Sequence, residues 1–476
     1  MQINSFARIF HRTLPLFIDS ASNIVIPFLR TFVLTHLLGP YEFGFAAALA
    51  ATYATFELIT DIAITNFVFS SPRSVYAEAV AGAHAVSMVR GFCVGCFVLL
   101  ASMPVACTLA ACVDWPSFAW LALATFIQSF GHLEIRVNAS RDYRYWPPAI
   151  ASIASHGSGL LALALIAYEF GNHYAYIAYL LVQAPVYVLM THLLASSRYS
   201  VNYRTPFVRK ALVFGLPLLL NGVGLAIMSQ GDRWIVGSLL GLPLLGLYSL
   251  ITLAAFVPLT GLYKIMSPIQ FAGLHNARIE TGEYDARLKL YSRAVPVVAA
   301  AFAVCIIAVY GELIPAVFGK RFIVSESMIF LLALVVYVRI IRTDPQTSLL
   351  FNAQNTRKLA IAGQAPFIGL FVTAGLVIIH PTLEAVLVGS LVGEIAGLLV
   401  IGYIARRLLR SAIYDHVFSA LAMFAIVVAA GVTMLLARSG DVLASRVAIG
   451  GVFLLVVVAY AGLSLPGLYK RAYRAH

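Results

Sequence analysis

The chain has 476 residues, of which 61% are hydrophobic and 11% are charged, and its mean hydropathy is +0.90. A soluble domain carries roughly 25% charged residues, so this composition excludes a water-soluble protein. A formal net charge of +12 could indicate nucleic-acid binding, but the basic residues separate apolar runs and do not form one face. We therefore expect a multi-pass membrane protein that binds no nucleic acid.

The apolar runs are long enough to cross a bilayer about fourteen times. A span needs about 20 mostly apolar residues, and runs without period-2 alternation favour helices over a barrel. The sequence therefore predicts an all-α polytopic membrane protein with no soluble domain and no cleavable signal. The predicted spans are 13–37, 42–70, 84–109, 115–137, 147–168, 174–195, 211–238, 244–272, 292–314, 324–349, 359–379, 383–405, 416–437 and 447–466.

Lysine and arginine are concentrated in every second predicted loop. One set of loops, together with both termini, holds about 22 of them, and the other set holds about four. The positive-inside rule places the rich set and both termini in the cytoplasm, which requires an even number of spans. The longest predicted loop, near 273–291, belongs to the cytoplasmic set.

A weak internal repeat relates the two halves of the chain at an offset of 202 residues. Leu37-Leu38-Gly39 matches Leu239-Leu240-Gly241, and Gly44 matches Gly246. Six predicted spans separate the copies, and an even number preserves orientation, so the sequence predicts two parallel six-helix repeats about an axis along the membrane normal. The predicted parts are an N-terminal six-helix lobe at 1–205, a C-terminal six-helix lobe at 206–410, and two additional helices at 411–476.

Two segments carry a family resemblance. The turn Leu38-Gly39-Pro40-Tyr41-Glu42-Phe43-Gly44 resembles the LG-x-x-x-(F/Y)-G turn of polysaccharide transporters in the multidrug/oligosaccharidyl-lipid/polysaccharide exporter superfamily. The segment 231–241, which reads Gly-Asp-Arg-Trp-Ile-Val-Gly-Ser-Leu-Leu-Gly, resembles the seventh helix of that family. The length, the 6+6+2 plan and the short loops fit the same family.

The resemblance implies an O-antigen or exopolysaccharide flippase in the bacterial inner membrane. Such a protein would move undecaprenyl-diphosphate-linked oligosaccharide from the cytoplasmic to the periplasmic leaflet by alternating access. It would have this lipid-linked oligosaccharide as its substrate, the polysaccharide biosynthesis machinery as a candidate partner, and H⁺ or Na⁺ as a candidate coupling ion.

Cations inside the predicted spans indicate a polar interior, because a charge at the bilayer centre costs about 2.5–3.5 kcal/mol on insertion scales. Arg30 and Arg233 each lie about 12 Å from the outer turn at 1.5 Å per residue, and Arg30 aligns with Asp232 across the repeat. If both helices line one cavity, these arginines face it together and can bind a diphosphate bidentately. Snorkelling or an ion pair with a neighbouring helix is the alternative for each. The candidate phosphate-binding residues are Arg30, Arg233, Lys264, Arg339 and Arg90.

Carboxylates inside the spans form a second group of candidates. Glu57 and Asp61 are spaced i, i+4 on one helix face at the depth of Arg90. They predict either a structural pair with Arg90 or a site for a coupling proton or sodium ion. The coupling-ion or charge-pair candidates are Glu57, Asp61, Asp232 and Glu394.

Glu394 lies near mid-membrane beside the stripe Gly389-x3-Gly393-x3-Gly397, which is typical of closely packed membrane helices. A pair between Glu394 and Arg339 is compatible with their depths. Arg342, one turn from Arg339, is expected to snorkel towards the inner surface.

The remaining motifs indicate no enzyme. Cys93-x-x-Cys96 has redox spacing, but its setting favours small apolar helix residues. There is no Walker A sequence and no H-E-x-x-H, so no metal or other cofactor is expected. A membrane polymerase or ligase is a further alternative, but it would be expected to carry a large periplasmic loop, and the longest predicted outer loop has about ten residues.

A multidrug-type small-molecule exporter is the main alternative to the flippase. Such an exporter would favour acidic cavity residues that attract cationic drugs. The intramembrane cations of this chain slightly outnumber the anions, which favours an anionic substrate.

Overall fold

The computed structural model describes residues 25–109, 111–142, 144–277, 282–343, 347, 350, 356–409, 412–436 and 442–473. Within these residues all regular secondary structure is helical, which confirms the predicted all-α class. Eleven segments of the described chain are long and apolar enough to cross a membrane. The protein is therefore a multi-pass membrane protein, while the exact count of fourteen and the 6+6 repeat stay predictions.

The chain divides into two compact units, Met1–Ser249 and Leu250–His476. The long helix α9 (Pro206–Leu239), which the repeat assigns to the start of the second lobe, lies inside the first unit. It packs on α2 (Pro40–Ile59), α3 (Ile64–Ser70) and α4 (Tyr76–Thr108). The predicted lobe boundary after residue 205 and the separate status of 411–476 stay predictions.

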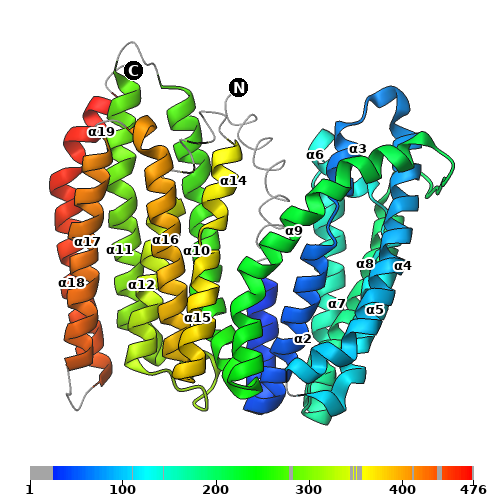
Figure 1. Cartoon of the computed structure of the whole chain (residues 1–476), viewed down its shortest axis with the longest axis horizontal. Helices are drawn as coiled ribbons and strands as arrows, with labels where there is room; N and C mark the ends of the chain where they lie inside the picture. Colours follow the sequence, from blue (N-terminus) through cyan, green and yellow to red (C-terminus); the bar gives the residue numbers. More distant parts are fainter. Residues whose placement is uncertain are drawn as a thin grey trace, which may run out of the picture. The chain divides into compact units, whose positions relative to one another are not determined.

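In the first unit, neighbouring helices form antiparallel pairs: α4 lies beside α5 and α7 beside α8, and α9 packs along α2 (Figure 1). The elements are the helix Val25–Leu37, α2 (Pro40–Ile59), α3 (Ile64–Ser70), η1 (Arg73–Val75), α4 (Tyr76–Thr108), η2 (Cys112–Asp114), α5 (Trp115–Gln128), α6 (Glu134–Asp142), α7 (Trp146–Phe170), α8 (Tyr174–Leu194), α9 (Pro206–Leu239) and the start of α10 (Leu242–His275).

Proline and glycine set several of these helix boundaries. Pro40 and Pro206 begin α2 and α9 at positions where the missing backbone N–H costs nothing. Gly171 ends α7 with a left-handed φ of 61°, which allows the tight turn into α8. The Thr205 side chain accepts a hydrogen bond from Phe207 N at the start of α9.

Two predicted spans of the first unit are interrupted in the structure. The expected span 42–70 ends its first helix at Ile59 and resumes at Ile64, with Ala63 at a left-handed φ of 48°. The expected span 115–137 ends its helix at Gln128, and α6 begins only at Glu134. Both breaks lie at one end of the unit, together with the basic loop before α9. We call this end, formed by 60–76, 129–142, 144–145 and 195–206, the basic end.

In the second unit, α11 packs against α12, α17, α18 and α19, and α16 packs against α12 and α15 (Figure 1). The elements are the remainder of α10, α11 (Glu283–Phe318), α12 (Glu326–Thr343), α14 (Thr356–Gln364), α15 (Phe367–Ile379), α16 (Leu383–Leu409), α17 (Ala412–Leu436), α18 (Val442–Ser464) and α19 (Pro466–Ala472).

The predicted loop 273–291 is largely helical, because α10 continues to His275 and α11 begins at Glu283. Arg287, which was expected in that loop, is buried. Its guanidinium donates to the carbonyl of Gly273 at 2.8 Å and to that of Ala472 at 3.3 Å, so it joins the ends of α10 and α19. These bonds satisfy carbonyls that lack a partner at helix C-termini.

The glycine stripe of α16 packs as the sequence predicts. A Cβ added at Gly393 would lie 2.9 Å from the Cα of Gly369 on α15, and one at Gly389 would lie 2.6 Å from the Cα of Thr373. The two backbones therefore approach closely along this face. The expected span 359–379 is divided at Pro366, between α14 and α15.

Candidate functional site

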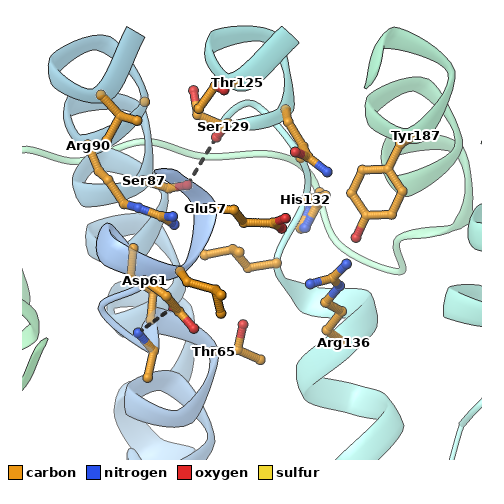
Figure 2. A pocket seen from close by; sticks show the side chains of 18 of the residues that line it. Glu57, Asp61, Thr65, Ser87, Arg90, Thr125, Ser129, His132, Arg136 and Tyr187 are labelled. Atoms are coloured by element: carbon orange, nitrogen blue, oxygen red, sulfur yellow. Dashed lines mark hydrogen bonds between the residues drawn. The ribbon is translucent and has the colours of Figure 1, made fainter. Parts of the chain in front are cut away.

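The first unit contains a polar cavity of about 380 Å³ near its basic end. Residues of α2, α4, α5, α6 and α8 line it, and the α2–α3 break forms part of its wall. Figure 2 shows Glu57 projecting into the cavity, with Arg90 on one side and His132 and Arg136 on the other. Two carboxylates, Glu57 and Asp61, thus share one cavity with two guanidinium groups.

The break after α2 decides where Asp61 lies. The sequence placed Asp61 on the same helix face as Glu57, but the helix has ended at Ile59, so that placement is wrong. Asp61 Oδ1 accepts a hydrogen bond from Ala63 N at 2.8 Å, a local bond that stabilises a turn in place of helix. Glu57 and Asp61 still line the same cavity, because the turn folds back towards it.

Arg90 lies on the cavity wall opposite the α6 side. Its Nη2 donates to Thr60 Oγ1 at 3.2 Å. The predicted direct pair of Arg90 with Glu57 or Asp61 is not among the ion pairs within 4.0 Å in the described chain. Both carboxylates nevertheless face Arg90 across the cavity (Figure 2). Water or a small ligand can therefore enter between the opposite charges.

Hydrogen bonds between helices hold the cavity walls in place. Tyr53 donates to Gln128 Oε1 at 2.6 Å and links α2 to the end of α5. Ser87 donates to the carbonyl of Ser129 at 3.1 Å and links α4 to the α5–α6 break, as the dashed line in Figure 2 shows. The Ser87 bond satisfies the carbonyl of Ser129, at the point where the break ends the intrahelical hydrogen bonds of α5.

Two buried histidines, His84 and the cavity residue His132, fix the α5–α6 break. The Nε2 of His84 accepts a bond from Leu133 N at 3.2 Å, and its Nδ1 lies 2.9 Å from the carbonyl of Ser200. The Nε2 of His132 lies 3.2 Å from the carbonyl of Ser197. The break is therefore tied to α4 and to the segment that precedes α9.

Arg30 packs inside the first unit against α8. Its guanidinium carbon lies 5.1 Å from the ring centre of Tyr176 and 5.3 Å from that of Tyr179. These distances are typical of cation–π contacts, which favour arginine over lysine. The prediction that Arg30 and Arg233 face one cavity together stays a prediction.

The side chains of Asp232 and Arg233, which are adjacent on α9, reach different residues, while Asp232 Oδ1 also accepts from the backbone N of Arg233 at 2.8 Å. Asp232 accepts a hydrogen bond from the Tyr248 hydroxyl of α10. The Arg233 guanidinium donates to Ser229 O and to Gln230 Oε1, each at 2.9 Å, on its own helix. Lys264 is exposed on α10.

In the second unit, one carboxylate joins two arginines. Glu394 of α16 is 3% exposed, and its two oxygens accept from Arg339 Nε at 2.6 Å and from Arg342 Nε at 2.7 Å. The pair of Glu394 with Arg339 that the sequence permitted is therefore present. The expectation that Arg342 snorkels to the surface is wrong, because the buried carboxylate offers it a nearer partner. The cluster of Arg339, Arg342 and Glu394 carries a net charge of +1.

Neighbouring side chains from α10 surround this arginine–glutamate cluster. The guanidinium carbon of Arg339 lies 4.1 Å from the ring centre of Phe256. Tyr263 donates to the carbonyl of Arg339 at 3.1 Å and to Thr343 Oγ1 at 3.3 Å. Contacts from α10, α12 and α16 thus fix the orientation of Arg339, whose side chain stays 31% exposed.

The structure adds residues that the sequence interpretation did not select. Arg136, at the end of the predicted span 115–137, lies on α6 and lines the cavity with Gln128, His132 and Tyr187. A cation inside an apolar span was a usable signal. The sequence interpretation read this segment as a continuous span that ended in a loop, and so missed it.

Comparisons with known proteins agree with this architecture. A family model described as polysaccharide biosynthesis protein matches residues 33–327. A comparison with curated protein sequences finds no match. The lipid II flippase MurJ in an inward closed conformation is 13% identical, with 97% of this chain and 100% of that chain covered and a TM-score of 0.60.

Transporters of the multidrug resistance MATE family are also similar in structure. An inward-facing member, described as belonging to the MOP superfamily, is 16% identical over 85% of this chain and 96% of that chain, with a TM-score of 0.56. A MATE protein in complex with MaD5 is 15% identical over 85% and 95%, with a TM-score of 0.51. At these identities the likeness establishes a shared fold.

Proposed function

The chain belongs to the polysaccharide biosynthesis protein family, and we propose that it is a flippase for a lipid-linked oligosaccharide. The proposed substrate is an undecaprenyl-diphosphate-linked oligosaccharide, moved from the cytoplasmic to the periplasmic leaflet of a bacterial inner membrane. Both termini would lie in the cytoplasm, as the distribution of lysine and arginine predicts.

The observation that carries this proposal is the buried cluster of Arg339, Arg342 and Glu394. Two guanidinium groups contact one buried carboxylate, which holds both cations inside the helix bundle of the second unit. Buried charge inside a membrane protein is costly and indicates a functional role by default. A diphosphate is a fitting partner, because guanidinium groups bind phosphate oxygens in a bidentate geometry and never lose their charge.

The cavity of the first unit has a different charge balance and suits a different role. Glu57 and Asp61 offset Arg90 and Arg136, so the four side chains sum to zero. Binding of one proton or one Na⁺ at a carboxylate would change this sum to +1. We assign the cavity to the coupling ion, whose binding would alter the attraction of this unit for an anionic substrate.

In this mechanism, the sugar and the diphosphate cross inside the protein while the prenyl chain stays in lipid. Alternating access exposes the polar site first to one leaflet and then to the other. Arg30, Arg233 and Lys264 are further candidates for contact with the diphosphate along this route. The polysaccharide biosynthesis machinery would supply the substrate and take up the product.

A strain that lacks the gene tests the proposal. The lipid-linked oligosaccharide should accumulate in the cytoplasmic leaflet, where a membrane-impermeant glycosidase added to spheroplasts cannot reach it. Wild-type chain and Glu169→Gln, a change at an exposed position of α7, should restore access. With Arg339→Ala, the amount of oligosaccharide that the glycosidase cleaves should fall at least about tenfold below wild type, the equivalent of 1.4 kcal/mol. Arg339→Lys should restore less cleavage than the wild-type chain does.

An unchanged leaflet distribution in the deletion strain would contradict the flippase proposal. If the same strain became sensitive to cationic drugs and the wild-type chain reversed this, the protein would be a multidrug-type exporter. Normal membrane levels of each variant, measured by immunoblot, are required for either conclusion.

A further inference from the structure

Two of the five cysteines form a disulfide in the structure, which the sequence interpretation did not foresee. Cys107 is next to the last residue of α4, and Cys112 begins η2, so the bond closes the turn between α4 and α5. Both residues are exposed. Cys93, Cys96 and Cys305 are free thiols.

The disulfide lies at the end of the first unit opposite the basic end. Helix α4 begins at Tyr76, in the basic end, and runs over 33 residues to Thr108, which corresponds to about 50 Å at 1.5 Å per residue and exceeds a bilayer core of about 30 Å. The α4–α5 turn and the basic loops therefore lie on opposite sides of the membrane.

We propose that Cys107 and Cys112 are oxidised in the cell to a structural disulfide, and that the α4–α5 turn faces an oxidising, extracytoplasmic compartment. Disulfides persist in such compartments, whereas cytoplasmic reductants keep thiols reduced. The positive-inside rule assigns the same side to this turn from lysine and arginine alone. The distribution of lysine and arginine and the oxidation of the two cysteines thus place the α4–α5 turn on the same side of the membrane for independent physical reasons.

The oxidation is a thiol–disulfide exchange with a protein disulfide oxidant of that compartment. The thiolate of one cysteine attacks the disulfide of the oxidant and forms a mixed disulfide. The thiolate of the second cysteine then attacks the sulfur of the first and displaces the thiolate of the oxidant. One S–S bond forms between Cys107 and Cys112, the S–S bond of the oxidant breaks, and its two sulfurs leave as thiols. The two protons and two electrons lost by the cysteines end on the oxidant.

The bond holds a turn that packs on α9. Leu109 is 2% exposed, and a Cβ at Gly237 of α9 would lie 2.6 Å from its Cδ2. Ala111 is also buried. At the start of α5, Ser117 Oγ lies 3.0 Å from His173 Nε2. The disulfide therefore fixes the short connection between two packed helices at the outer end of the unit.

Differential alkylation of the full chain in cell membranes tests the redox state. Free thiols are blocked with N-ethylmaleimide under acid quench, the sample is reduced, and new thiols are labelled with maleimide-polyethylene glycol. Wild type should gain two adducts that depend on reduction. Cys107→Ser should gain none, because its remaining Cys112 is blocked in the first step. No reduction-dependent adduct on wild type would overturn the proposal.

A second measurement tests the side of the membrane without relying on the bond. In Cys107→Ser with Cys93, Cys96 and Cys305 replaced by alanine, Cys112 is the single thiol. A membrane-impermeant maleimide sulfonate, added to intact spheroplasts, should label it as fully as after lysis. Labelling only after lysis would place the turn in the cytoplasm and overturn the proposal. Loss of the disulfide should also lower the midpoint of thermal unfolding by a few degrees.

Discussion

Gly44 of α2 and Gly246 of α10 contact each other, and they are separated by 202 residues, the offset of the internal repeat. A Cβ at Gly246 would lie 3.1 Å from the Cα and the N of Gly44. The two glycines hold equivalent positions in the sequence repeat, and their contact brings α2 and the start of α10 together inside the first unit. The two parallel six-helix repeats stay a prediction.

Gly44→Ala should destabilise the protein, because the added Cβ would lie 1.8 Å from the carbonyl oxygen of Leu242. A backbone atom cannot move aside as a side chain can, so we expect a loss of at least about 1–3 kcal/mol, the usual cost of overpacking. Thermal unfolding of the detergent-solubilised chain measures the change. Gly39→Ala is the matched control, because Gly39 has an ordinary φ of −70° and nothing lies within 4 Å of its added Cβ. Equal midpoints for the two variants would contradict the packing.

Glu394→Ala should lower stability by about 3–5 kcal/mol, because removing one partner leaves buried charges uncompensated. The double variant Glu394→Leu with Arg339→Leu should recover part of that loss. A double-mutant cycle on thermal unfolding, with Glu394→Leu and Arg339→Leu as the two single changes, gives the coupling energy of the pair. Purely additive effects of the two single changes would argue against the contact between Arg339 and Glu394.

Glu57→Gln should reduce oligosaccharide export at least about tenfold, while the level and the unfolding midpoint of the protein stay near wild type. The change keeps the size of the side chain and removes the negative charge that offsets Arg90 and Arg136 in the cavity. Export should also lose its dependence on the ion gradient, measured with ionophores in spheroplasts. Glu78→Gln, at an exposed position near the start of α4, is the control. Full gradient-dependent export by Glu57→Gln would exclude Glu57 as the ion site.

Glu134→Gln should destabilise the basic end of the first unit. The carboxylate accepts from Ser197 N at 3.0 Å and from the Ser197 hydroxyl, and Asn138 donates to its other oxygen at 3.0 Å. Hydrogen bonds to a charged group contribute about 1.5–3 kcal/mol each, so we expect earlier unfolding and faster amide exchange near 195–205. Hydrogen exchange with mass spectrometry measures this. Unchanged exchange there, with Glu169→Gln as reference, would show that these bonds add little.

The sequence by itself determined the class of the protein and most of its helices. Apolar runs of membrane-spanning length leave the backbone one way to satisfy its polar groups in lipid, so helices such as α7 and α8 match their predicted ranges within two residues. The close packing at the glycine stripe of α16 could also be predicted from the sequence. Three small residues at i, i+4 and i+8 permit close packing whatever the partner helix is.

Only the tertiary structure decided how the intramembrane charges are grouped. The sequence placed Asp61, Arg136 and Arg342 within the predicted spans 42–70, 115–137 and 324–349. It did not show that Glu394 would reach both Arg339 and Arg342, or that helix breaks would bring Arg136 and Asp61 to one cavity. Hydropathy records the cost of inserting each residue separately. Charge pairing and helix breaks depend on partners many positions away, because a buried charge or an unpaired backbone group is stabilised by whichever neighbour the fold supplies.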